Sequence, residues 1–383
     1  MKKIFLFMIT FLISFRVFAT VDFAKNSKSA ILIESTTGKI LYEKNSNEKR
    51  SPASMTKMMT LLLTTEALEN GKIKLDDMVH VSRNASSMGG TQIFLEENSE
   101  ISVETLLKGI SIASANDAAV AIGEYIGGTL DNFVSMMNNR CKELGCKNTE
   151  FKNPHGLDEE GHLTTAYDMS LIARELVKHE SVLKLTSTYE DNISVSGENH
   201  WLVNTNKLIR FYKGIDGLKT GYTDNAGYCL TATMNKNNMR LISVVMGSDT
   251  KDNRSSDTIG MLEYGYSMYG SNTVIKKDEF NGTLHIENAK VRDIKYYLDT
   301  DINLIVDKNV RDVNYKTDIE LFKVKAPLKK NSKVGVLKLY YDNKTYSYDL
   351  VVHEDIEKAS YFKVFSNLLK DVFSGDRARS RAN

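Results

Sequence analysis

Segments with the pattern of β-strands lie at both ends of the first 270 residues, and segments with the pattern of helices lie between them. Near the N-terminus, residues 29–34 (SAILIE) and 40–43 (ILYE) flank a polar turn, which predicts a hairpin. At the other end, GIDGLKTGYT, AGYCLTATMN and MRLISVVMGS predict three consecutive strands. Residues 103–180 carry the apolar spacing of helices. We therefore predict an α/β (more strictly α+β) fold, in which both chain ends build one antiparallel sheet around an inserted helical subdomain.

Two further helices and a second domain complete the predicted organisation. A helix should begin around Pro52 and run through MMTLLLTTEAL, and another should cover 255–269. From about residue 273, short strands recur at regular spacing: TLHIEN, INLIVD, DIELFKV, KVGVLKLYY and TYSYDLVV. This pattern predicts a separate small all-β domain over 273–356, which we interpret as a packing or spacer module.

The first nineteen residues have the composition of a secretory signal. Lys2 and Lys3 form a basic start, an apolar run follows from Ile4 to Phe15, and the segment ends on Val17-Phe18-Ala19. An uncleaved membrane anchor is the weaker alternative, because the apolar run is short for a bilayer. The mature chain should begin near Thr20 and act outside the cytoplasmic membrane, where ATP and nicotinamide cofactors are scarce. We therefore expect no cofactor.

The C-terminal segment 357–383 has the pattern of an amphipathic helix. Its apolar residues fall on one helical stripe: Tyr361, Phe362, Phe365, Leu368, Leu369, Val372 and Phe373. Three arginines follow at 377, 379 and 381. In a secreted protein this pattern favours a helix lying on the outer face of the cytoplasmic membrane. The alternative is a helix packed on its own domain.

Charge and cysteine content exclude several classes of function. The chain has 50 basic and 49 acidic residues, which leaves no overall field for nucleic acid. Three cysteines do not make a disulfide framework. Cys141 and Cys146 are five apart with no matching Cys/His pair, so we expect thiols rather than a metal site. A secreted, cofactor-free enzyme is most often a hydrolase.

A serine and a lysine provide the first candidate catalytic pair. The chain contains neither HExxH nor GxSxG, and none of its seven histidines lies in a local triad pattern. Ser54-Met55-Thr56-Lys57 fits S-x-x-K at the start of a helix, where a spacing of three puts both side chains on one face. A desolvated, neutral Lys57 could take the serine proton. Four other S-x-x-K matches show that this motif is weak alone.

Two further motifs follow in the chain. Ser114-Ala115-Asn116 gives an S-x-N between two predicted helices, although Asn116 could simply cap the second helix. Lys219-Thr220-Gly221 lies on a predicted strand. Lys219 and Thr220 offer a cation and a hydroxyl to a carboxylate, and Gly221 exposes the strand backbone to an extended substrate. The alternative is a turn lysine before a bulge glycine. In this order the three motifs match the set of serine β-lactamases and penicillin-binding proteins.

The sequence resembles the low-molecular-mass penicillin-binding proteins of the D-alanyl-D-alanine carboxypeptidase type (peptidase family S11). The blocks that carry the resemblance span roughly residues 28–270: SPASMTKMMT, GGTQIFL, SIASANDAAVAIGEYIGG, NPHGLDEEGHLTTAYDM and GIDGLKTGYTDNAGYCLTAT. The resemblance implies a transpeptidase-like catalytic domain over 20–272. The β domain and the amphipathic tail also fit the architecture of this family.

The resemblance implies a role for each motif residue. Ser54 would be the acylated nucleophile and Lys57 its general base. Ser114 would relay protons to the leaving amine, and Asn116 would hold the substrate amide. Lys219 and Thr220, with Gly221 beside them, would bind the substrate's terminal carboxylate.

The backbone N–H groups of Ser54 and Tyr222 would form the oxyanion hole. Several family members have histidine where this chain has Tyr222, so any role of that ring is lost here. Arg254 only loosely matches an arginine near the cleft.

The implied substrate is a peptidoglycan stem peptide ending in D-Ala-D-Ala, and the implied inhibitors are β-lactam antibiotics. Two alternatives remain open: a β-lactamase of the same fold, and a non-catalytic cell-wall-binding scaffold. Asn153-Pro154-His155-Gly156 predicts a tight turn in which the His155 ring braces a loop; the alternative is a catalytic His155. Trp201 is predicted to lie in a loop-like region with its ring packed in the core; the alternative is a ring that lines the substrate cleft.

Overall fold

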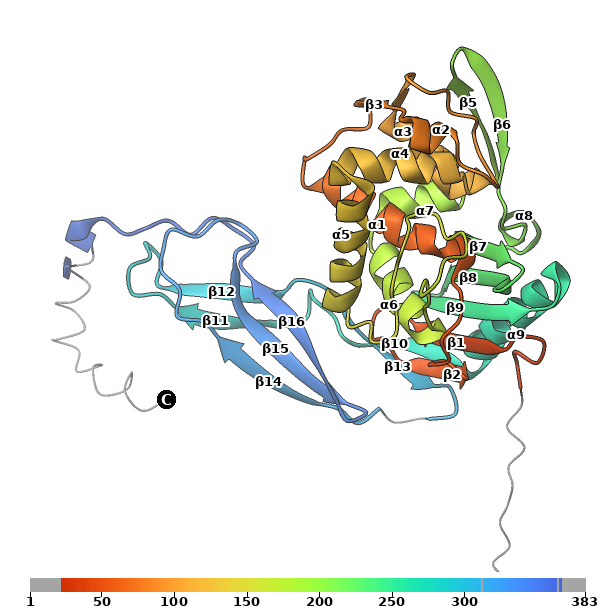
Figure 1. Ribbon diagram of the computed structural model, residues 1–383. Coiled ribbons are helices and arrows are strands. Elements are labelled where there is room, and N and C mark those ends of the chain that lie inside the picture. The colour runs from red at the N-terminus through yellow and green to blue at the C-terminus, as the bar shows by residue number, and fades with distance from the viewer. Residues whose placement is uncertain (1–21, 311–312, 364, 367–383) are drawn as a thin grey trace, which may run out of the picture.

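The computed structural model describes residues 22–310, 313–363 and 365–366. The predicted signal segment and most of the predicted amphipathic tail lie outside these residues. Figure 1 shows a domain of sheet and helices that carries a second, all-β domain to one side. Across the described residues, no helix is long and apolar enough to cross a membrane.

A five-stranded antiparallel sheet joins the two ends of the first domain, as predicted. Its order is β2 (Ile40–Lys44), β1 (Ser29–Glu34), β9 (Met239–Ser248), β8 (Gly227–Lys236) and β7 (Ile215–Thr223). Strand β1 lies between β2 and β9, and every one of its residues is buried. Strand β7 is at the edge and pairs only with β8.

Helices cover both faces of this sheet (Figure 1). Alternation along β1 sends Ile31 toward one apolar core and Leu32 toward the other. The core around Ile31 contains residues of α1 (Lys57–Glu69) and α6 (Ala166–Leu176). The core around Leu32 contains residues of α9 (Lys251–Met268), which begins four residues before the predicted helix.

The helical subdomain also contains a long loop over residues 144–165. Besides α1 and α6, its helical segments are α2 (Arg83–Ser86), α3 (Val103–Lys108), a π-helical turn (Gly109–Ala113), α4 (Asn116–Gly127), α5 (Leu130–Glu143), α7 (Glu180–Thr186) and α8 (Leu208–Phe211). Two short hairpins complete it: β3 (Met78–His80) with β4 (Glu100–Ser102), and β5 (Glu190–Val195) with β6 (Glu198–Val203). No helix covers 144–165, so the prediction of a mostly helical 103–180 omits this loop.

The C-terminal domain has its own sheet and its own core. The sheet order is β11 (Asn281–His285), β12 (Asp293–Leu298), β16 (Lys344–Val351), β15 (Lys333–Tyr341) and β14 (Lys316–Leu321). A separate antiparallel pair is formed by β10 (Tyr269–Ile275), which follows directly after α9, and β13 (Ile302–Asp307). Ile305 on β13 packs into the core beneath α9, so this pair links the two domains.

Two side-chain predictions were wrong. Cys141 and Cys146 form a disulfide, because α5 ends at Glu143 and Gly145 (φ +90°) reverses the chain. The Cys146 N–H then donates to the Cys141 carbonyl at 2.9 Å. Trp201 lies on strand β6 and is 67% exposed, because alternation along β6 buries its neighbour Leu202 instead. Cys229 remains a buried free thiol.

Candidate active site

Ser54 lies in a 3-10 turn, Ala53–Thr56, that leads directly into α1. Ser54 is partly exposed, whereas Ala53 and Met55 are fully buried. Ala53 has a φ of +47°, a left-handed backbone that alanine rarely adopts. Such strain persists only where the surroundings hold it in place.

Hydrogen bonds from a distant histidine hold this turn. The Nδ1 atom of His162 accepts from the Lys152 N–H at 2.9 Å, so Nε2 carries the proton of the neutral ring. Nε2 donates to Thr56 Oγ1 at 2.8 Å, and Thr56 donates in turn to the Ala53 carbonyl at 2.8 Å. Burial lowers the pKa of His162 to about 4, which keeps the ring neutral near pH 7.

Lys57 is completely buried, and its Nζ atom lies close to three oxygen atoms. Nζ lies 3.0 Å from Ser54 Oγ, 2.7 Å from Asn116 Oδ1 and 2.7 Å from the His155 carbonyl. Burial, followed by the positive charge of Lys219, lowers the pKa of Lys57 well below its ordinary value. A neutral lysine in hydrogen-bond contact with a serine hydroxyl can act as its general base.

Asn116 points its side chain into the site and does not cap α4. The residue at the cap position is Ala115, whereas Asn116 Nδ2 donates to the Gly89 carbonyl at 2.7 Å. The structure therefore excludes the helix-cap alternative and ties the Gly89-Gly90 loop to Lys57 through one amide. Ser114 sits between the π-helical turn and α4 in a left-handed conformation (φ +68°) and is nearly buried.

Lys219 and Thr220 lie on the edge strand β7 beside a second buried cation. Lys219 is 1% exposed, and its Nζ donates to the Thr220 carbonyl at 3.1 Å. Burial and then the charge of Arg254 lower the pKa of Lys219 to about 7. Arg254 is 6% exposed, and its Nε has no hydrogen-bond partner within the described chain. Two desolvated cations side by side favour binding of an anion such as a carboxylate.

Gly221 lets the edge strand approach the Ser54 turn closely. A Cβ at this position would lie 2.9 Å from the Pro52 carbonyl oxygen and 3.1 Å from the Ala53 Cβ. Only glycine fits there without displacing backbone. The neighbouring Tyr222 is half exposed, stacks on Tyr228 at 4.4 Å and donates its hydroxyl to Asp224.

The 153–156 turn is confirmed, and it packs against the nucleophile. The Gly156 N–H donates to Asn153 Oδ1 at 2.7 Å, and the Leu157 N–H donates to His155 Nδ1 at 3.1 Å. The His155 ring therefore braces the loop. Its pKa is lowered to about 3, first by burial and then by Lys57, so the ring is neutral.

Gly156→Ala is expected to destabilise the protein and to displace Ser54. Gly156 has a φ of +90°, and an added Cβ would lie only 1.9 Å from the Ala53 carbonyl oxygen. We expect the free energy of unfolding to fall by at least about 2 kcal/mol, measured in urea. Gly161→Ala is the matched control, since Gly161 (φ +79°) meets only the flexible end of Lys152. Equal losses in the two variants would contradict the proposed contact.

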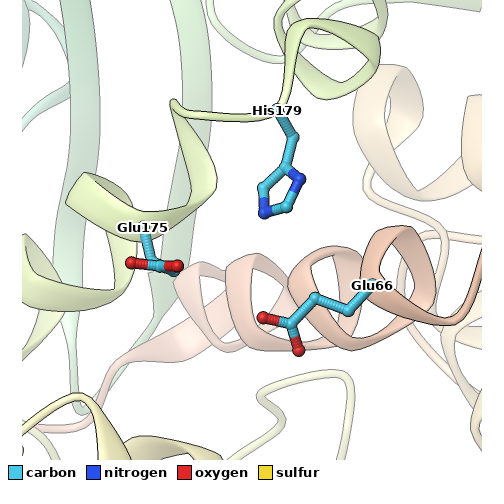
Figure 2. Close-up of side chains that lie close together, drawn as sticks. All are labelled: Glu66, Glu175 and His179. Carbon is cyan, nitrogen blue, oxygen red and sulfur yellow. The ribbon is translucent and has the colours of Figure 1, made fainter. Parts of the chain in front are cut away.

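A cluster outside the candidate active site combines a histidine with two glutamates: Glu66, Glu175 and His179 (Figure 2). Arg140 binds both carboxylates, at 2.7 Å from Glu66 and 3.4 Å from Glu175. The His179 Nδ1 lies 2.8 Å from Glu69. A guanidinium already neutralises the two acids, so we interpret the cluster as an ion-pair network between helices α1, α5 and α6.

Three supporting residues act on the site from positions that are distant in the sequence: His162, Arg254 and Asp117. His162 and Arg254 act from 106 residues beyond Thr56 and 35 residues beyond Lys219 respectively. Asp117 is buried and accepts from the backbone N–H groups of Ile93 and Leu95, which positions the loop carrying Gly89 and Gly90. Pairings over such separations cannot be derived from spacing.

A serine beside a desolvated lysine, next to the edge strand of an antiparallel sheet, defines a serine acyl-transfer enzyme of the penicillin-binding type. Comparison with protein families matches residues 17–250 to the family described as D-alanyl-D-alanine carboxypeptidase. Residues 269–358 match the C-terminal domain of penicillin-binding protein 5. The chain belongs to the D-alanyl-D-alanine carboxypeptidase family, peptidase family S11.

Relatives match over nearly the whole chain. D-alanyl-D-alanine carboxypeptidase DacF of Bacillus subtilis is 45% identical over 355 residues, 92% of this chain and 91% of the relative. DacA of Escherichia coli is 32% identical over 91% of this chain and 88% of its own length. Penicillin-binding protein 5 of Haemophilus influenzae superposes with a TM-score of 0.68 at 31% identity, covering 87% of this chain and 98% of that one. The resemblance and the predicted fold class are confirmed.

Proposed function

We propose that the protein is a serine D-alanyl-D-alanine carboxypeptidase that removes the terminal D-Ala from peptidoglycan stem peptides through an acyl-enzyme on Ser54. The observation that carries the proposal is the 3.0 Å contact between Lys57 Nζ and Ser54 Oγ in a buried site that lowers the pKa of Lys57 well below its ordinary value. The names of the relatives support the same activity. The β-lactamase and scaffold alternatives have no such support.

The reaction has two steps, acylation of Ser54 and hydrolysis of the resulting ester. Ser54 Oγ attacks the carbonyl carbon of the penultimate D-Ala, and its proton passes to Lys57. The N–H groups of Ser54 and Tyr222 stabilise the oxyanion. When the C–N bond breaks, the leaving amine takes a proton relayed from Lys57 through Ser114. Water then hydrolyses the ester on Ser54 and releases the shortened stem peptide.

Substrate binding follows from the charges along β7. Lys219, Thr220 and Arg254 receive the terminal carboxylate. The backbone at Gly221 and Tyr222 then pairs with the extended peptide along the free edge of the sheet. Asn116 holds the substrate amide while it also positions Lys57.

The test is D-alanine release by the purified mature protein from a diacyl-Lys-D-Ala-D-Ala peptide. Release that a penicillin blocks is the expected result. Rapid penicillin hydrolysis without a lasting adduct would favour a β-lactamase. Absence of both release and acylation in folded protein would favour a scaffold.

The pH dependence of the reaction should report both lysines. Below the lowered pKa of Lys57 the base becomes protonated, so kcat/KM falls as the pH falls. Above about pH 7 Lys219 loses its proton and attracts the carboxylate less, so KM rises with pH. Lys219→Arg should remove the rise in KM, because an arginine stays charged. A KM that is flat from pH 6 to 9 in the native protein would contradict the role of Lys219.

Domain limits and location complete the proposal. We retain 1–19 as signal, 20–272 as catalytic domain, 273–356 as β domain and 357–383 as tail. The second sheet that begins after α9 supports the division between the two domains. Tyr361, Phe362 and Phe365 are 91%, 83% and 60% exposed, which supports a tail that contacts the outer face of the cytoplasmic membrane. Protein lacking 360–383 should leave the membrane fraction, and retention there would contradict this role of the tail.

A further inference from the structure

The placement of the motifs gives the direction of the bound stem peptide. Its terminal carboxylate lies at Lys219 and Thr220, and its scissile carbonyl lies at the Tyr222 N–H. The preceding residue of the stem must therefore continue past Tyr222 toward Thr223, where β7 ends. Strand geometry advances by about 3.3 Å per residue, so the third stem residue reaches the end of this strand.

A single carboxylate ties together the backbone segments at that end of β7. Asp158 accepts from Ser51 at 2.8 Å, from Thr223 at 2.9 Å and from Asn225 at 3.1 Å. These bonds link the segment before Ser54, the end of β7 and the loop that contains His155. A cavity of about 540 Å³ opens beside them and is lined by Ser51, Asp158 and Asn225.

The cavity presents groups of both charges. Its acidic lining residues are Asp158, Glu159 and Glu160, and its basic ones are Lys49 and Arg50. The Arg50 side chain is 13% exposed. Its Nη1 pairs with Glu48 at 2.5 Å, and its Nε is buried without a hydrogen-bond partner in the described chain. His162 also lines the cavity but is neutral near pH 7.

Ligand groups of opposite sign fit such a lining. An ammonium would be attracted by the three acids, and a carboxylate by Lys49 and Arg50. A side chain of four carbons reaches about 6 Å from its Cα atom, which spans from the strand to a neighbouring cavity. The Tyr222 ring, stacked on Tyr228 beside Asp224, borders the same end of the strand and provides an apolar face for the carbons.

We propose that this cavity binds the side chain of the third stem residue and selects one that ends in both an ammonium and a carboxylate, as a diamino dicarboxylic acid does. The proposal rests on the proposed function, because it uses the direction of the substrate along β7. A lysine at the third position would satisfy the acids and bring no carboxylate to Lys49, while Arg50 would keep only its pair with Glu48. An Nε-acylated lysine carries neither charge, so it would pair with neither the acidic nor the basic residues of the cavity.

The test compares three soluble stem pentapeptides that differ only in the third residue: meso-diaminopimelate, L-lysine and Nε-acetyl-L-lysine. We expect kcat/KM for D-alanine release to fall about 10-fold at each replacement, with the change mainly in KM. Lys49→Gln should reduce the preference for diaminopimelate over lysine. Glu160→Gln should reduce the preference for lysine over acetyl-lysine.

Matched controls carry the same charge changes in the β domain. Lys323 and Glu287 are exposed, so Lys323→Gln and Glu287→Gln should leave all preferences unchanged. Equal kcat/KM for the three peptides, or preferences unaltered by Lys49→Gln and Glu160→Gln, would overturn the cavity assignment while the carboxypeptidase activity stands. Absence of release from every peptide would overturn the proposed function and this inference with it.

Discussion

Ser54→Ala is expected to abolish both D-alanine release and covalent binding of penicillin. No other hydroxyl shares the contact with Lys57 Nζ in the described structure, so the acyl-enzyme cannot form. A lost nucleophile in a serine hydrolase costs about 10⁴- to 10⁶-fold in kcat. The measurements are D-alanine release and intact-mass spectrometry after incubation with a penicillin, where the native protein should gain the mass of one inhibitor.

A second S-x-x-K in the same chain gives the matched control for this variant. Ser181 and Lys184 share the spacing of the proposed pair but lie on the short helix α7, where Ser181 is exposed. Ser181→Ala should react and hydrolyse like the native protein. D-Alanine release that survives in Ser54→Ala would refute the assignment of the nucleophile.

Lys57→Met is expected to slow acylation by penicillin and by peptide by about 10²- to 10⁴-fold, the contribution typical of a general base. Methionine approximates the length of the lysine chain but cannot accept the Ser54 proton. It also leaves Asn116 Oδ1 and the His155 carbonyl without their donor, which should cost about 1–3 kcal/mol of stability. Thermal unfolding must therefore be followed beside the rate.

Lys57→Arg separates the charge of this residue from its basicity. An arginine keeps a cation near Ser54 but cannot be deprotonated, so it should be as inactive as Lys57→Met. Near-native rates in Lys57→Arg would show that a cation, and not a base, is required. Lys184→Met is the control for the removal of a lysine at the second S-x-x-K.

Much of the fold could be predicted because its signals are local. The hairpin of β1 and β2 and the three strands β7, β8 and β9 each show their pattern within ten residues. The β domain was predicted from the same kind of pattern. The predictions were wrong where the same local sequence pattern is compatible with two different structures. Cys141 and Cys146 would be separate on a continuous helix, but the helix ends between them.

Trp201 shows the same limit for a single side chain. Its size predicts burial, yet adjacent residues of a strand point to opposite faces, and in β6 it is Leu202 and not Trp201 that lies on the buried face. Which of the two faces the core depends on the placement of the whole hairpin. Figure 1 shows the hairpin of β5 and β6 projecting from the rest of its domain, and Trp201 on this hairpin is 67% exposed.

By itself, the sequence determined the order of the elements, the family blocks and the motif residues Ser54, Lys57, Asn116 and Lys219. Their spacing along helices and strands is a property of the local chain. Only the tertiary structure decided their chemistry. The pKa of Lys57 falls because segments some 60 and 100 residues away bury it and supply its acceptors at Asn116 and His155. Desolvation and charge act through space, so the reactivity of the lysine depends on contacts that no stretch of neighbouring residues contains.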